Sequence, residues 1–76
     1  MLENERVHEI QVEIGMLKSK LYSSASNIGD WKINKIYEYR MQGLEDPYDF
    51  DALCKERQAA RDRINELEEE LKTLGY

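Results

Sequence analysis

Apolar residues recur at alternating spacings of three and four in the first part of the chain. The series consists of Val7, Ile10, Ile14, Leu17 and Leu21. Such spacing is typical of a helix that buries one narrow stripe against another helix. A stretch rich in serine, asparagine and glycine follows, and these residues favour turns over helix. We therefore predict a first helix over about residues 3–22.

The last third of the chain repeats this spacing. Its series consists of Leu53, Ala60, Ile64, Leu67, Leu71 and Leu74, with Arg57 at the one core position that is not apolar. Asp46 can cap a helix that begins at Pro47, and Asp49 adds negative charge to its positive end. These residues predict a third helix over about residues 47–74.

A shorter helix is expected between these two. Asp30 suits a first helical turn, and Gly43 followed by Leu44 is typical of a helix end. We predict a second helix over about residues 30–42. The fold class predicted is all-α, with the first and third helices in an antiparallel, coiled-coil-like hairpin that the short second helix crosses.

Charged residues beside the two stripes predict how the hairpin is aligned. When opposed residue numbers sum to 74, Leu17 faces Arg57 and Leu21 faces Leu53. The flanking pairs are then opposite in charge: Arg6 with Glu70, Glu13 with Arg63, and Lys20 with Glu56. Sums of 67 or 81 set like charges against each other, so we predict 74. The same pattern also fits helices from two chains, although a crossing second helix favours one chain.

The predicted alignment leaves the end of the third helix without a partner. An uncovered apolar end often marks an association surface. We therefore expect a homo-oligomer contact at Leu71, Leu74 and Tyr76.

Length and charge restrict the function. A chain of 76 residues supports one domain, residues 1–76, with a small core. A net charge of -5 argues against direct binding of nucleic acid or anionic lipid. No apolar run is long enough for a membrane span, and the first residues lack a signal pattern. We expect a cytoplasmic protein.

Residues that carry catalytic chemistry are scarce. The chain has one histidine, His8, and one cysteine, Cys54, and no glycine-rich phosphate loop. We interpret His8 as a solvated surface residue and Cys54 as an ordinary half-buried thiol. The glutamates of the last helix point to different faces, which disfavours a metal site. We predict no enzymatic activity, no cofactor and no metal.

The second helix has the composition of a protein-binding surface. Tryptophan, tyrosine and arginine dominate binding hot spots. The predicted contact residues are Trp31, Lys32, Lys35, Tyr39 and Arg40. The alternative is packing: Ile33, Ile36, Tyr37 and either Arg40 or Met41 face the hairpin, with Trp31 as a core anchor. Both interpretations are compatible if one face of the helix packs on the hairpin and a different face binds the partner.

Two acidic groups can attract a basic partner protein. One is the row of Glu5, Glu9 and Glu13, which share a helical face, and the other is Glu68, Glu69 and Glu70. The alternative interpretation is a solvated acidic surface in each case.

The stretch GDWKINKIYEYRMQGLEDPYDFDAL, followed by ERQAARDRINELE, resembles a group of small helical proteins encoded in phages and prophages. The resemblance covers about half the chain and excludes the first helix. The matching residues are Gly29, Asp30, Lys32, Lys35, Glu38, Gly43, Pro47, Tyr48, Asp49, Leu53, Arg57, Gln58, Arg61, Asp62, Ile64, Asn65 and Leu67. It implies a phage origin and carries over no catalytic or binding residue.

A phage origin favours two functions. The first is a non-catalytic protein-binding module that inhibits a host defence protein, such as a CRISPR nuclease complex. The alternative is a coiled-coil accessory of the virion tail region that acts by homo-oligomerisation.

Overall fold

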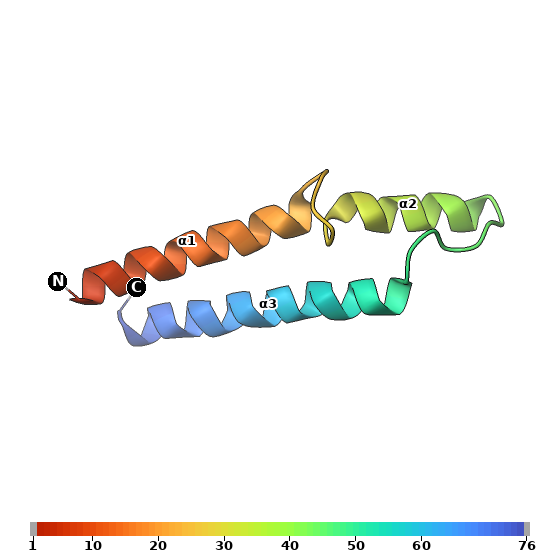
Figure 1. Ribbon diagram of the computed structural model, residues 1–76. Helices are drawn as coiled ribbons and strands as arrows, with labels where there is room; N and C mark the ends of the chain where they lie inside the picture. Colours follow the sequence, from red (N-terminus) through yellow and green to blue (C-terminus); the bar gives the residue numbers. More distant parts are fainter. Residues whose placement is uncertain (1, 76) are drawn as a thin grey trace.

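The computed structural model describes the backbone of residues 2–75 and the side chains of residues 5–75. It contains three helices: α1 (Leu2–Tyr22), α2 (Asp30–Met41) and α3 (Phe50–Thr73). α1 and α3 pack as an antiparallel hairpin, and α2 runs on beyond the end of α1 (Figure 1). No strand occurs in the described residues, so the predicted all-helical hairpin is confirmed. None of the three helices is long and apolar enough to cross a membrane.

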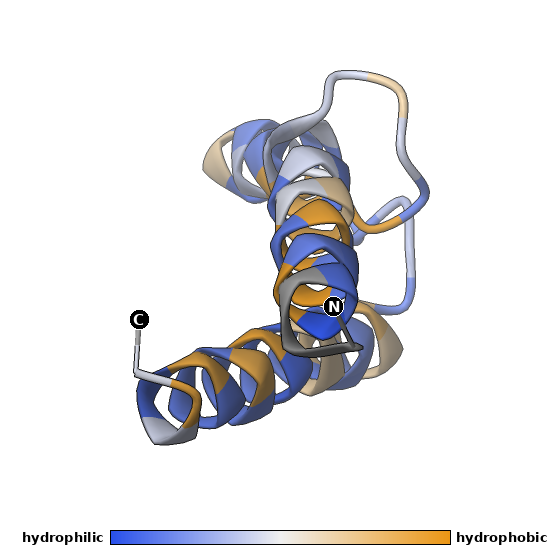
Figure 2. Cartoon of the chain, turned by 90° about the vertical axis from the view of Figure 1, so that its left-hand side faces the viewer, coloured by the Kyte–Doolittle hydropathy of each residue, from blue (hydrophilic) through white to orange (hydrophobic). Residues whose placement is uncertain are grey.

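A single apolar stripe forms the core of this elongated molecule, which measures 55 × 19 × 15 Å. The buried apolar residues are Val7, Ile10, Leu21, Ile36, Leu53, Ala60, Ile64 and Leu67. Figure 2 shows apolar residues recurring at intervals along α1 and α3. All the buried apolar residues occupy positions that the sequence predicted to face the core. Burial of each large side chain contributes about 1.5–3 kcal/mol.

The predicted alignment of the hairpin is wrong. Leu21 shares a buried cluster with Ala60 and Ile64, rather than facing Leu53. The Lys18 Nζ lies 3.9 Å from a Glu68 oxygen. If the numbers of opposed residues summed to 74, Lys18 and Glu68 would be about 18 Å apart along the hairpin axis, which is beyond the reach of their side chains. The opposed residues therefore have numbers that sum to more than 74.

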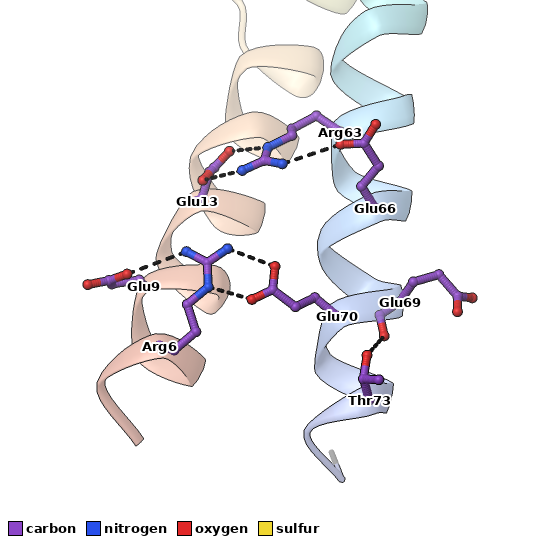
Figure 3. A network of polar contacts seen from close by, with 8 residues as sticks. All are labelled: Arg6, Glu9, Glu13, Arg63, Glu66, Glu69, Glu70 and Thr73. Carbon is purple, nitrogen blue, oxygen red and sulfur yellow. Dashed lines mark hydrogen bonds and ion pairs between the residues drawn. The ribbon is translucent and has the colours of Figure 1, made fainter. Parts of the chain in front are cut away.

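Diagonal ion pairs explain why the charge argument chose the wrong alignment. Arg6 still pairs with Glu70, and Arg63 still pairs with Glu13, because each arginine reaches along the helix axis (Figure 3). The third predicted pair, Lys20 with Glu56, is absent from the ion pairs of residues 5–75. Long side chains thus form the same pairs in more than one alignment.

The expected overhang of α3 is absent in this alignment. Leu71 and Leu74 are half-buried. Half-burial neither forms nor excludes an oligomer contact, so the use of these two residues stays a prediction. Tyr76, the third residue of that prediction, lies outside the described residues.

The helix ends follow local capping chemistry. The Gly43 φ is +75°, and the Leu44 N–H donates to the Tyr39 carbonyl at 2.9 Å, which confirms the predicted end of α2. The predicted start of α3 at Pro47 is wrong. Asp49 caps α3 instead, since its carboxylate accepts a hydrogen bond from the Ala52 N–H at 3.0 Å.

Arg57 closes the hairpin at the loop between α1 and α2. Its side chain is only 8% exposed, and its Nη1 donates to the carbonyls of Leu21 at 3.2 Å and Ile28 at 2.7 Å. Its Nη2 donates to the Asp30 carboxylate at 2.7 Å. The polar residue in the apolar stripe therefore joins the end of α1, the loop and the start of α2.

Candidate functional site

The predicted contact residues of α2 divide into two groups. At its start, the half-buried Trp31 donates its indole N–H to the Ser26 carbonyl and meets the Tyr48 ring edge-on at 5.7 Å. The Lys32 Nζ lies 4.7 Å from the centroid of the Tyr48 ring, and the Lys35 Nζ lies 5.9 Å from it. Trp31 is thus engaged within the chain, and the two lysines cover an aromatic pair.

The second group lies at the other end of α2. Arg40 donates two hydrogen bonds of 2.7 Å to the Asp46 carboxylate, and its guanidinium lies 4.5 Å from the centroid of the Phe50 ring. The hydrogen bonds from Arg40 lower the pKa of Asp46. Tyr39 is half-buried. The structure therefore does not bring Trp31, Tyr39 and Arg40 together as one contact surface.

Most of the predicted acidic residues are paired with cations. Glu9 and Glu70 both contact Arg6, and Glu13 contacts Arg63 (Figure 3). The guanidinium of Arg6 lowers the pKa of Glu70 by hydrogen bonding, and Arg63 does the same for Glu13. The charge of Glu70 raises the pKa of Glu13, but this effect is the smaller one. These carboxylates help hold the hairpin together.

The remaining acidic residues lie on open surface. Glu68 contacts Lys18, and Glu69 contacts Lys72 at 3.5 Å, both on exposed parts of the helices. Glu5 is exposed. Neither acidic group forms a separate site, so any attraction toward a basic partner arises from the net charge of -5.

Three large apolar residues are exposed at the far end of α2 and in the turn after it. They are Tyr37, Met41 and Leu44, which are 50%, 86% and 51% exposed. The packing interpretation holds for Ile36, which is fully buried, and for Arg40, which lies over the Phe50 ring of α3, whereas Met41 is turned to solvent. Tyr37 is half-exposed and lines a hollow together with Cys54 and Arg61 of α3. The spacing of four between Tyr37 and Met41 already places them on one face, but the sequence does not show that this face is uncovered. We call these three residues the α2 patch.

Groups suited to catalysis or metal binding do not converge. His8 is exposed on α1, and Cys54 is half-buried on α3. Within the described part of the chain, no three His, Cys, Asp or Glu residues are placed to hold a metal ion.

Comparison of the chain with protein-family models, curated proteins and solved structures gives no significant match. The resemblance to phage proteins and the expected function therefore stay predictions.

Proposed function

We propose that this protein is a non-catalytic protein-binding module whose contact surface is centred on the α2 patch. The observation that carries the proposal is the exposure of Met41, which reaches 86%, beside the half-exposed Tyr37 and Leu44. Tyrosine and methionine are enriched in protein interfaces. An uncovered cluster of large apolar side chains on a small acidic protein is most simply explained by a partner that covers it.

The surroundings of the α2 patch are pre-organised for binding. Arg40 is held by Asp46 and by the Phe50 ring, so its guanidinium loses little freedom when a partner docks beside it. The left-handed Gly43 and the Leu44 hydrogen bond fix the turn that carries Leu44. A rigid apolar centre with an ordered arginine at its edge has the composition of a binding hot spot.

For its biological role, we propose inhibition of a host defence protein, such as a CRISPR nuclease complex. This role rests on the resemblance to phage proteins and on the net charge of -5, which suits a partner with a basic surface. The rival role, a virion accessory that self-associates through Leu71 and Leu74, loses the overhang on which it depended.

The test is a pull-down from bacterial host lysate with the tagged wild type and two double variants. Met41→Asp with Leu44→Asp changes the α2 patch, and Val12→Asp with Met16→Asp changes a matched exposed apolar pair on α1. We expect mass spectrometry to identify a partner that is lost with the first variant and kept with the second. Truncating a central interface residue typically costs 2 kcal/mol or more, roughly a thirtyfold loss of affinity.

Two results would contradict the proposal. One is a partner retained by the α2 patch variant at wild-type level. The other is a wild type that recovers only copies of itself, with light scattering showing a stable oligomer. Circular dichroism of each variant shows that the helices are retained.

A further inference from the structure

Two shallow grooves meet on one side of α3. One lies between α1 and α3 and the other between α2 and α3, each with a volume of about 350 Å³. They share the side chains of Arg57, Gln58 and Arg61, so they are neighbours on α3, and we call the two together the α3 groove. Its exposed lining includes Lys18, Tyr22, Tyr37, Gln58 and Arg61, and the half-buried Cys54 also lines it.

The charge of the α3 groove is opposite to that of the chain. The chain has 16 acidic and 11 basic residues, yet no aspartate or glutamate lines either part of the groove. Asp62, next to Arg61 in sequence, accepts a hydrogen bond from the Gln58 side chain at 2.9 Å. Lys18 and Arg57 of the lining pair with Glu68 and Asp30 outside it, so the positive charge that the groove offers is that of Arg61.

Arg61 differs from the other arginines of the described chain. Arg6, Arg40, Arg57 and Arg63 each contact a carboxylate within 4 Å, whereas Arg61 forms no such ion pair. Its guanidinium is exposed in the middle of the groove, where the two parts meet. An arginine in this position can bind an incoming carboxylate through two parallel hydrogen bonds.

Two exposed tyrosines lie on either side of this arginine. Tyr22, which is 70% exposed, lines the α1 part of the groove, and Tyr37, 50% exposed, lines the α2 part. Tyrosine rings offer apolar surface with a polar tip and lose little conformational entropy on binding. The groove thus alternates aromatic, cationic and aromatic side chains along its length.

We propose that the α3 groove binds an extended acidic segment of the partner protein, with a carboxylate on Arg61 and apolar side chains against Tyr22 and Tyr37. This proposal rests on the proposed function, because Tyr37 belongs to both the α2 patch and the groove. Charge complementarity selects an acidic segment. A nucleic acid would bring one phosphate per nucleotide to a protein of net charge -5, which opposes its binding.

The experiment measures binding of a fluorescein-labelled nonapeptide of alternating glutamate and leucine by fluorescence anisotropy. A peptide with glutamine in place of glutamate is the neutral control. The variant Arg61→Ala removes the proposed carboxylate contact, and Arg61→Glu reverses its charge. Lys20→Glu, an exposed cation of α1 that lines neither part of the groove, is the matched control.

We expect Arg61→Ala to raise the Kd of the acidic peptide about tenfold, as the loss of a charge-assisted hydrogen bond implies. Arg61→Glu should abolish binding, and Lys20→Glu should leave the Kd within about twofold, since a distant exposed charge is screened. Cys54, the lone cysteine, provides a second measurement. Saturating acidic peptide should slow its reaction with a disulfide reagent several-fold, and the neutral peptide should not.

Four results would overturn the proposal: no binding at millimolar peptide, equal binding of the neutral peptide, equal effects of Arg61→Ala and Lys20→Glu, or tighter binding of a ten-residue thymidine oligonucleotide. The lysate pull-down distinguishes failure of the groove proposal from failure of the proposed function. If the α2 patch variant loses the partner while Arg61→Glu keeps it, protein binding stands and the groove proposal falls.

Discussion

Replacing Arg57 with alanine should destabilise the protein more than any other single change on α3. The side chain is 8% exposed and donates to two backbone carbonyls and one carboxylate. Alanine would leave the carbonyls of Leu21 and Ile28 without this donor. Leaving a buried acceptor without its donor costs about 1–3 kcal/mol, so the loss of both carbonyl contacts should cost roughly 2–6 kcal/mol. The Asp30 side chain is 46% exposed, so its ion pair contributes less than the two carbonyl contacts.

This loss is a large fraction of the total stability. Domains have roughly 0.05–0.15 kcal/mol of stability per residue, which for 76 residues is about 4–11 kcal/mol. We therefore expect Arg57→Ala to be partly or largely unfolded at 25 °C. Arg57→Lys should recover only part of the loss, because a compact ammonium cannot reach three separate acceptors as a guanidinium does.

Urea unfolding followed by circular dichroism measures the free energies. Fluorescence of the lone tryptophan, Trp31, reports separately on the loop, because its indole N–H binds the Ser26 carbonyl. Arg61→Ala, one turn further along α3 and exposed, is the matched control and should change stability by about 0.5 kcal/mol or less. The reasoning fails if Arg57→Ala costs under about 1 kcal/mol or no more than Arg61→Ala. Asp30→Asn, which keeps both carbonyl contacts, should cost about 1 kcal/mol.

Three further predictions concern the ion pairs, the first loop and the start of α3. Glu13 and Glu70 have pKa values lowered below their usual 4.5 by arginines of the opposite helix. The stability that these two carboxylates contribute is complete above that usual value and is lost as pH falls through their lowered pKa values. The melting temperature of the wild type should therefore fall between pH 5 and pH 3. The fall should be less steep in a variant with glutamine at both positions. Gly29→Ala should lower the free energy of unfolding in urea by about 1–3 kcal/mol, because the Cβ of alanine would collide with the Ser23 carbonyl. An unchanged unfolding midpoint would contradict this close packing of Gly29 against Ser23. Asp49→Ala should cost about 1 kcal/mol by the same measurement, and no loss would mean that the cap is unimportant.

Local rules account for the elements that the sequence predicted correctly. The three-and-four spacing of apolar residues places one face of α1 and α3 inward wherever the helices lie, and Gly43 ends α2 through its own backbone conformation. The start of α3 was predicted less well, because Asp46 and Asp49 are both suitable caps. Asp46 is instead held by Arg40, a contact that depends on the turn between α2 and α3.

The candidate site was less predictable than the fold. The sequence identified α2 as the segment rich in interface residues, but Trp31 and Arg40 are engaged by other parts of the chain. Met41 is exposed because neither α1 nor α3 covers that side of α2, whereas Tyr37 keeps one side against α3. The α3 groove requires Tyr22, Tyr37 and Arg61 to converge from three helices, and sequence spacing carries no information on such a convergence.

The sequence by itself determined three amphipathic helices, two of them paired as a hairpin, since helix periodicity and capping depend on neighbouring residues. Only the tertiary structure decided the alignment of that hairpin. Exposed charge pairs favour one alignment of the hairpin only weakly, because Arg6 and Arg63 reach their glutamates diagonally. Arg57 needs acceptors at the end of α1, in the loop and at the start of α2. Meeting all three acceptors places it at the end of the apolar stripe of α1, rather than opposite Leu17 as the charges alone predicted.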